Sequence, residues 1–327
     1  MLANTNNENT GKSNTFHNEK LTLYLQQLIL SNNNDKRLTK QFLYNEKELL
    51  NFENELEDVA NDSSINIFNN VYHRYPNKIL LFPTENCLGH CRFCFRKFIR
   101  GSKTITDNDF ISACSYLRER PNINEVILSG GDPLVLSPDK LLSMISELRN
   151  IKTVRIIRIH TRVLTFNPIL LTDEFIENLV RFLPIFFVFH INSHLELTET
   201  AKNRIQKIIN NGMQCYSQTA LLREINDNFD DLSILLTELL YTGVKPYYLF
   251  HPDKVKGTSH FYVPLKHGID LYNSLYNIIS GLAMPIYLFN IPNGYGHSII
   301  DLGNITQIGD NKYNIKTWEG KEFVYEE

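Results

Sequence analysis

Two hydrophobic patterns divide the chain near Tyr75 and Pro76. From Leu21 to about Asn70, apolar residues recur at steps of three and four between acidic and Asn-rich stretches, which predicts two or three amphipathic helices. After Pro76, short runs of β-branched and aromatic residues alternate with helical patterns. The sequence therefore predicts an N-terminal helical extension followed by a larger α/β unit.

The larger unit contains seven predicted strands and six predicted helices. The strands are 79–83, 125–128, 153–160, 185–191, 213–218, 244–249 and 284–288. The helices are 107–120, 138–150, 173–182, 198–212, 230–242 and 266–281. Regular alternation of strand and helix is typical of a parallel β/α barrel, so we expect a partial TIM-like barrel. A flat doubly wound sheet is the alternative architecture.

These patterns define four segments. We expect a disordered leader over residues 1–20, because this stretch is rich in Asn, Thr and Lys and has almost nothing apolar. The helical extension then covers 21–72, the partial barrel 73–300 and a C-terminal tail 301–327.

Composition narrows the class of protein. The 327 residues are 43% hydrophobic with a net charge of -3, which permits a large core and gives no electrostatic case for nucleic acid. No apolar run reaches the roughly 18 residues of a membrane span, and the N-terminal stretch lacks the hydrophobic core of a signal peptide. We therefore expect a cytoplasmic protein without nucleic acid or membrane partners.

Three cysteines lie close together after the first predicted strand. Cys87, Cys91 and Cys94 form a C-x3-C-x2-C triplet, and three thiolates in one short loop favour soft iron. A cubane cluster has four irons, so three protein ligands leave one iron open to another ligand. Zinc, disulfides and chance clustering are the alternatives. His90 is badly placed to complete a zinc site, and an odd total of five cysteines without a secretory leader indicates reduced thiols.

Polar residues also follow the ends of six consecutive predicted strands. In chain order they are Cys87, Ser129 to Asp132, His160 to Arg162, His190 with Asn192, Gln218, and His251 to Asp253. Working residues of β/α barrels lie at the carboxyl ends of the strands, where the loops converge. We therefore expect these side chains to surround one site.

The turn Ser129-Gly130-Gly131-Asp132 has two glycines where the backbone can approach a ligand closely. Taken alone, it is equally well a tight strand-to-helix turn. Beside a cluster loop, we interpret it as the binding site for the amino acid end of S-adenosylmethionine, whose amino and carboxylate groups can chelate the open iron. Reductive cleavage of that cofactor gives a 5′-deoxyadenosyl radical.

Four charged residues are candidate ligand contacts. The guanidinium of Arg96 suits a substrate carboxylate, and Asp253 suits a substrate ammonium group. Arg74 and Lys78 suit a phosphate. The plain alternatives are a solvated basic loop at Arg96, a turn residue at Asp253 and surface charges at Arg74 and Lys78.

Together these motifs resemble the lysine 2,3-aminomutase-like branch of the radical S-adenosylmethionine superfamily, from about His73 to Gly296. The matching segments are His73 to Pro76, Cys87 to Arg96, Leu128 to Pro133, His190 to Asn192, Gln218 to Asp227 and Pro246 to Tyr248. Cys94 to Arg96 and Asp253 to Phe261 look most like the members that act on a lysine of translation elongation factor P.

The resemblance implies a role for each matching residue. Cys87, Cys91 and Cys94 would bind a 4Fe-4S cluster, and Ser129, Gly130, Gly131 and Asp132 would contact S-adenosylmethionine. Arg96 would bind the substrate carboxylate and Asp253 its distal ammonium group. Arg74, Tyr75 and Lys78 occupy positions around pyridoxal phosphate, and His190, Asn192 and Gln218 line the space between the two cofactors.

The sequence departs from the family at the end of the barrel. The family has an acidic residue there, then Pro, a Gly-rich run and a lysine that holds pyridoxal phosphate as a Schiff base. Here Asn290 stands at the acidic position and His297 at the lysine position. Imidazole cannot form the imine, and Asn290 removes half of the expected clamp on a lysine side chain. Replacement by Lys254 or Lys256, and binding of pyridoxal phosphate without a tether, stay open.

We therefore predict an oxygen-sensitive radical S-adenosylmethionine enzyme that abstracts hydrogen from a small amino-acid-like substrate. Arg96, Asp253 and Asn290 would contact that substrate, and His297 would act as an acid or base near neutral pH. Without pyridoxal phosphate the outcome is epimerisation, dehydrogenation, elimination or decarboxylation, and with it 1,2-amino migration on a free amino acid or a protein lysine. A non-catalytic iron-sulfur scaffold is the remaining alternative. Flavodoxin or ferredoxin is the expected type of electron donor, and a homo-oligomer stays open.

Overall fold

The computed structural model describes residues 19–50, 54–68, 70–98, 101–301 and 303–327. The leader expected to be disordered, residues 1–20, lies outside the described residues except for its last two positions.

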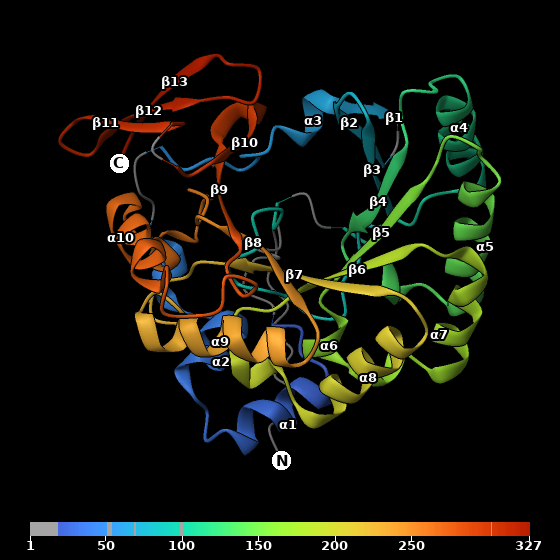
Figure 1. The fold of residues 1–327 in the computed structure, drawn as a ribbon, viewed down its shortest axis with the longest axis horizontal. Helices are drawn as coiled ribbons and strands as arrows, with labels where there is room; N and C mark the ends of the chain where they lie inside the picture. The colour runs from blue at the N-terminus through green and yellow to red at the C-terminus, as the bar shows by residue number, and fades with distance from the viewer. Residues whose placement is uncertain (1–18, 51–53, 69, 99–100, 302) are drawn as a thin grey trace, which may run out of the picture.

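A ten-stranded sheet curves through the centre of the molecule, and its strands follow chain order from β1 to β10 (Figure 1). The strands from β3 to β9 are parallel to their neighbours. Their bounds are β3 Lys78–Thr84, β4 Glu125–Gly130, β5 Ile156–Thr161, β6 Ile185–His190, β7 Gln214–Ala220, β8 Lys245–Phe250 and β9 Ile286–Ile291. All seven predicted strands are therefore confirmed.

The strand order distinguishes the two architectures left open by the sequence. A doubly wound sheet reverses its order part-way, whereas here each strand pairs with the next one along the chain. Among the described strands, β1 and β10 form the two edges and do not pair with each other. The fold is a partial parallel β/α barrel, as predicted.

Helices cover the outer face of the sheet (Figure 1). They are α4 Asp107–Arg118, α5 Pro138–Arg149, α7 Asp173–Leu179, α8 Glu199–Asn210, α9 Phe229–Tyr241 and α10 Leu265–Leu275, which confirms the six predicted helices. The first five begin after a Thr, Ser or Asn whose side chain accepts a backbone N–H of the first turn. Their apolar faces pack on buried strand residues such as Val126, Ile157 and Phe187.

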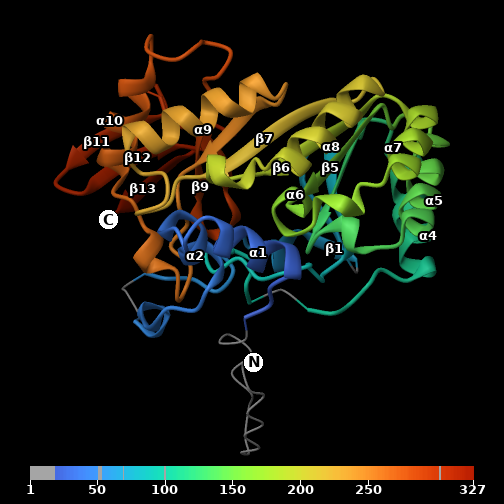
Figure 2. The same cartoon turned by 90° about the horizontal axis from the view of Figure 1, so that it is seen from below.

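The N-terminal part contributes α1 Leu23–Ser31, α2 Lys36–Phe42, the 3-10 helix η1 Glu46–Leu49 and α3 Asp62–Ile65. In Figure 2, α1 and α2, in dark blue, lie side by side below the sheet. Phe42 and Leu25 pack with Phe166 of α6 (Val163–Phe166), and Cys91 lies against the same cluster. The extension therefore supports the cysteine loop directly.

Both edges of the sheet contain strands that the sequence did not predict. β1 (Asn66–Phe68) and β2 (Val71–Tyr75) precede β3, and β10 (Gly296–Ile299) runs antiparallel to β9. A separate sheet follows, with β11 Ile305–Gly309, β12 Lys312–Lys316 and β13 Glu322–Glu326. Its Ile315 and Tyr325 pack with Phe289 of β9. No helix among the described residues is long and apolar enough to cross a membrane.

Candidate active site

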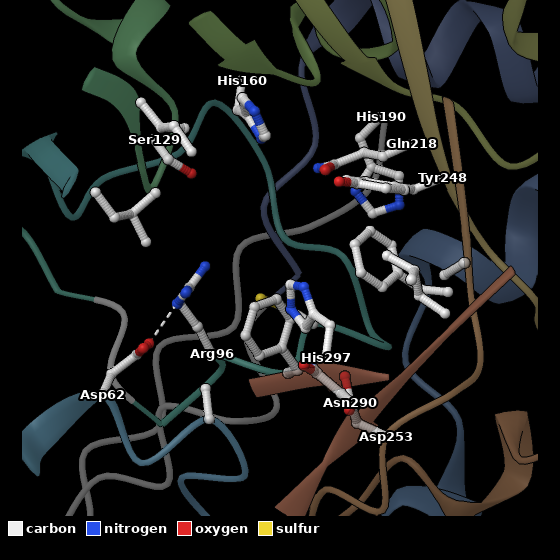
Figure 3. Close-up of a pocket in the computed structure, with 18 of the residues that line it drawn as sticks. Asp62, Arg96, Ser129, His160, His190, Gln218, Tyr248, Asp253, Asn290 and His297 are labelled. Carbon is white, nitrogen blue, oxygen red and sulfur yellow. Dashed lines mark hydrogen bonds and ion pairs between the residues drawn. The ribbon is translucent and has the colours of Figure 1, made fainter. Parts of the chain in front are cut away.

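A cavity of about 600 Å³ lies inside the barrel, where the carboxyl ends of the strands converge (Figure 3). Of the site residues predicted from the sequence, the structure brings all but Asn192 to its wall. They are Arg74, Tyr75, Lys78, Cys87, Cys91, Cys94, Arg96, Ser129, Gly130, Gly131, Asp132, His190, Gln218, Asp253, Asn290 and His297.

The cysteine loop is held in place by backbone contacts with the start of the described chain. His90 N–H donates to the Lys20 carbonyl at 3.0 Å, and Lys20 Nζ donates to the Cys87 carbonyl at 2.5 Å. Gly89 packs so closely on Phe166 and Lys20 that a Cβ atom would collide with both. The loop between the first two cysteines therefore requires glycine at this position.

A buried ion pair anchors the other side of the loop. Arg92 donates from Nε and Nη2 to Glu48 of η1 at 2.7 and 2.6 Å, and Lys97 Nζ lies 3.4 Å from the same carboxylate. Arg92 N–H also donates to the carbonyl of Gln41 in α2 at 2.8 Å. Two elements of the N-terminal extension thus fix the loop that carries the three thiols.

The Ser129 to Asp132 turn presses against the same loop. Gly130 has a φ of +100°, and a Cβ atom on Gly131 would collide with the Asn86 carbonyl next to Cys87. Glycine is therefore needed at both positions, one for its backbone angle and one for close approach. Figure 3 shows the Ser129 hydroxyl directed into the cavity.

Asp132 supports the turn from behind. Its carboxylate accepts from the Thr161 hydroxyl at 2.8 Å, Arg162 N–H at 2.8 Å and Leu134 N–H at 3.0 Å. Burial raises the pKa of Asp132 to about 6, and these hydrogen bonds oppose the shift. Asp132 joins the ends of β4 and β5, so its main contacts are with protein.

His190, Asn192 and Gln218 lie at the ends of β6 and β7. His190 Nε2 lies 3.0 Å from Asn192 Oδ1, and burial lowers the pKa of His190 well below its usual value. Asn192 is fully buried behind His190 and donates to Gln41 Oε1 at 3.0 Å. Gln218 lies beside His190 and Tyr248 in Figure 3. A neutral polar wall therefore faces the centre of the cavity.

Arg96 extends into the cavity from the cysteine loop and pairs with Asp62, a residue for which the sequence offered no signal. Its Nε donates to Asp62 Oδ2 at 2.6 Å, and its guanidinium lies 4.3 Å from the Phe95 ring centroid (Figure 3). Burial alone would lower the pKa of Arg96, but Asp62 raises it, so the guanidinium stays charged.

Asp253, Asn290 and His297 form the opposite wall. Asn290 of β9 and His297 of β10 are cross-strand partners. Burial raises the pKa of Asp253 to about 7, while a hydrogen bond with Asn290 opposes this shift. Burial and the nearby cations Arg74 and Lys78 lower the pKa of His297 to about 4. The neutral form of the His297 ring is therefore favoured at pH 7.

Arg74 and Lys78 place positive charge beside His297. Arg74 donates to the carbonyls of Gly294, at 2.6 Å, and Ala60. Lys78 Nζ lies 4.9 Å from the centroid of the Tyr75 ring. The Tyr75 hydroxyl accepts a hydrogen bond from the backbone N–H of His297 at 3.1 Å. Desolvation lowers the pKa values of Arg74 and Lys78, and neither forms an ion pair with a carboxylate in the described part of the chain.

The chain is similar in sequence to known proteins. The model of the Radical SAM superfamily matches residues 81–245. The chain belongs to the Radical SAM superfamily. A putative L-lysine 2,3-aminomutase of Aquifex aeolicus is 34% identical over 257 residues, covering 78% of this chain and 70% of the relative. The L-lysine 2,3-aminomutase of Methanococcus maripaludis is 31% identical, and the match covers 92% of this chain and 70% of the length of that protein.

A third relative has a different substrate in its name. The glutamate 2,3-aminomutase of Clostridioides difficile is 33% identical and covers 79% of this chain and 61% of its own length. These relatives confirm the resemblance to the aminomutase-like branch of the superfamily.

The superfamily implies a 4Fe-4S cluster and S-adenosylmethionine, and the cysteine loop fits the cluster. All three thiols line the cavity. No three Cys, His, Asp or Glu side chains among the described residues are gathered so that they could hold a metal ion. A single metal ion needs ligands that converge on one point, whereas each thiolate of a cubane cluster binds a different iron. The sulfur donors are the soft ligands that such a cluster takes.

A Schiff base of pyridoxal phosphate at position 297, where the family places its lysine, does not fit this radical SAM site. His297 cannot form an imine, and two N–H groups of Arg74 are taken by backbone carbonyls. The two replacement lysines are not among the described residues that line the cavity. Lys254 Nζ donates to the Glu326 carbonyl at 3.1 Å, and Lys256 pairs with Glu57 at 3.4 Å.

Sequence reasoning missed several side chains of the cavity. They include Asp62, Arg158, Tyr248 and Trp318, whereas His160 and Arg162 were expected at the site as strand-end residues but were given no role. The position of His160 and Arg162 at a strand end was a usable signal, and Arg158 shares the inward face of β5 with His160 because side chains alternate along a strand. Asp62 and Trp318 lie outside the predicted strands, so their sequence positions gave no comparable signal.

Proposed function

We propose that this protein uses a 4Fe-4S cluster on Cys87, Cys91 and Cys94 to cleave S-adenosylmethionine and to abstract hydrogen from an amino-acid-like substrate. The observation that carries the proposal is the placement of Arg96 and Asp253 at separate points on the wall of the cavity that the three thiols line (Figure 3). One is a half-buried cation and the other a half-buried carboxyl group. This arrangement suits a molecule with a carboxylate at one end and an ammonium group at the other.

Each wall has a separate task in this mechanism. When bound, the cluster and S-adenosylmethionine supply a 5′-deoxyadenosyl radical. Gly130 and Gly131 let the turn that would contact the amino acid end of the cofactor pack directly against the cysteine loop. Arg96 binds the substrate carboxylate and Asp253 orients the distal group. Phe93 and Phe261 provide apolar wall that keeps water from the reacting carbon.

His297 supports a reaction without a covalent pyridoxal adduct. Its ring is half-buried, has a pKa lowered by desolvation and nearby cations, and carries no primary amine. A bound carboxylate or phosphate next to it would raise its pKa, because an anion favours the imidazolium. His297 then exchanges a proton with substrate only when the anion is present. The proposed outcomes are those of a hydrogen-abstracting isomerase or lyase.

Anaerobic reconstitution tests the proposal. The reduced, iron-loaded protein is mixed with S-adenosylmethionine and with lysine, glutamate or a lysine-containing peptide, and 5′-deoxyadenosine is measured. We expect substrate-dependent 5′-deoxyadenosine, and incorporation of deuterium from a deuterated substrate into it. The variant Cys91→Ala is the control that should produce none. A fully loaded, reduced protein that forms no 5′-deoxyadenosine in any of these mixtures would contradict the enzymatic function.

Dependence on pyridoxal phosphate is tested separately. Arg74 and Lys78 offer positive charge to a phosphate, so the cofactor is added to the same assays with and without borohydride reduction. We expect turnover without it and no reduced adduct in the barrel. A labelled barrel lysine, or turnover only with pyridoxal phosphate, would instead establish the aminomutase reaction of the relatives.

A further inference from the structure

Arg162 contacts the cysteine loop at one of the proposed cluster ligands. It directly follows β5, and its Nη1 donates to Cys91 Sγ at 2.8 Å. The side chain is only 6% exposed, so this charged hydrogen bond is shielded from water. The sequence placed Arg162 at a strand end but assigned it no role.

Two buried partners hold the guanidinium in this orientation. Its Nη2 donates to Gln41 Oε1 at 2.5 Å and to Glu196 Oε2 at 3.1 Å. Glu196 is 1% exposed, and it also accepts from the Thr165 hydroxyl at 2.6 Å and from Asn192 N–H at 3.0 Å. Because each partner is itself hydrogen-bonded, Arg162 has little freedom to leave the thiol.

The backbone and the surrounding rings fix the same geometry. Arg162 N–H donates to Asp132 Oδ2, and Asp132 N–H donates to the Asn86 carbonyl, both at 2.8 Å. The guanidinium lies 4.8 Å from the Phe42 ring centroid and 4.9 Å from that of Phe93. The end of β5 and the cysteine loop are therefore joined at both main chain and side chain.

A cation in this position favours the reduced form of a cluster. Reduction adds one negative charge to the iron-sulfur core, and hydrogen bonds to the sulfurs are among the factors that set its potential. The attraction between the added electron and a guanidinium is strong where water is excluded. The Glu196 carboxylate opposes this effect because it partly neutralises the same guanidinium.

We propose that Arg162 is a positioning residue for the cluster and that its charged hydrogen bond to Cys91 raises the reduction potential of the cluster. This inference rests on the proposed function, because it requires the cluster at the three cysteines. It adds a residue outside the cysteine motif that governs how easily the radical-generating electron is accepted.

Redox titration of the reconstituted full chain, followed by electron paramagnetic resonance, tests the inference. In Arg162→Gln, which loses the charge, we expect the midpoint to become more negative by about 59 mV, a tenfold drop in the reduced-to-oxidised ratio at a given potential. In Arg162→Lys, which keeps the charge, the shift should be smaller. In Glu196→Gln the midpoint should move the opposite way, because the opposing carboxylate is gone.

A distant, half-buried arginine provides the control. Arg149 donates to the carbonyls of Phe182 and Arg155, so Arg149→Gln should leave the midpoint unchanged. An Arg162→Gln protein with full iron content and the wild-type midpoint would overturn the inference. If that variant retains no iron, Glu196→Gln decides, and a midpoint that stays or falls overturns it. A wild-type chain that holds no cluster would overturn the proposed function instead.

Discussion

Burial makes the charge of Asp253 depend on pH near neutrality. Desolvation raises its pKa to about 7, against the opposing effects of Asn290 and of the Arg96 charge. Below pH 7 the carboxyl group is mostly protonated and neutral, and above pH 7 it is mostly ionised. An ammonium group pairs with the ionised form, so the affinity for a lysine-like amino acid should fall as the pH drops below about 7, by up to about tenfold per pH unit. Equilibrium binding measured between pH 5.5 and 8.5 checks this.

The variant Asp253→Asn separates this titration from other pH effects. Loss of a charged hydrogen bond costs about 1.5 to 3 kcal/mol, so binding at pH 8 should weaken by roughly ten- to hundredfold. The pH dependence below 7 should disappear in the same variant. If the affinity of Asp253→Asn depended on pH as that of the wild type does, a group other than Asp253 would be the one that titrates.

Restoring an amine at position 297 should restore the covalent chemistry that the family uses there. A lysine at this position would be half-buried and near the cations Arg74 and Lys78, and both effects favour the neutral, nucleophilic amine. In His297→Lys, pyridoxal phosphate followed by borohydride should label residue 297, detected by peptide mass analysis.

His297→Gln is the size-matched control and should give no label at this position. A folded His297→Lys protein that takes up no label would show that the cofactor cannot reach this end of the barrel.

The sequence anticipated where candidate residues lie better than what they contact. Side chains at strand ends were predictable, because parallel strands bring their carboxyl ends to one edge. The pairing of Arg96 with Asp62 and of Arg162 with Cys91 was not, since each joins segments far apart in the chain. The same holds for Asp132. Its position at the turn was predictable, but the hydrogen bonds that its carboxylate accepts from three protein donors were not.

The short helix η1 stabilises the cysteine loop through one side chain. Glu48 is 4% exposed and pairs with Arg92, which is 3% exposed. Removing one member of such a buried pair leaves a charge without its compensating partner, so Glu48→Gln should lower the free energy of unfolding by about 3 kcal/mol. Chemical denaturation of the metal-free protein measures this, and iron content after reconstitution should fall in parallel.

An exposed ion pair in the same region serves as the control. Glu57 and Lys256 are 62% and 49% exposed, so Glu57→Gln should change the free energy of unfolding by no more than about 1 kcal/mol. Equal effects of the two substitutions would mean that η1 has no special part in holding the loop.

The elements that the sequence predicted are those with regular patterns. Buried parallel strands such as β6 are almost continuously apolar, and helices such as α5 repeat every three or four residues. The edge strands are short and show neither pattern. β1 has three residues, and its pairing with β2 shifts register. Their formation depends on pairing with a sheet already built by distant residues, which local pattern does not reveal.

The start of the ten-stranded sheet and the C-terminal sheet meet at the side of the cavity that carries Arg74 and Lys78. Tyr75 ends β2 near the beginning of the sheet, and Trp318 follows β12 in the C-terminal sheet. Their ring centroids are 5.5 Å apart, and both residues line the cavity with Lys78 and His297. The curvature of the whole barrel therefore brings opposite edges to one subsite, and the C-terminal sheet completes its wall.

Trp318 should report ligand binding at this subsite, because it is the only tryptophan in the chain. An anion that binds between Arg74 and Lys78 changes the electrostatic field at the indole, so titration with inorganic phosphate should change its emission saturably. Pyridoxal phosphate should quench the emission further, since it absorbs in that range. Lys78→Gln should weaken the phosphate response about tenfold, as expected for loss of a charged hydrogen bond, whereas Lys266→Gln on the exposed face of α10 should not. Emission that stays constant through both titrations would show that the positive charge at this end of the barrel serves the fold alone.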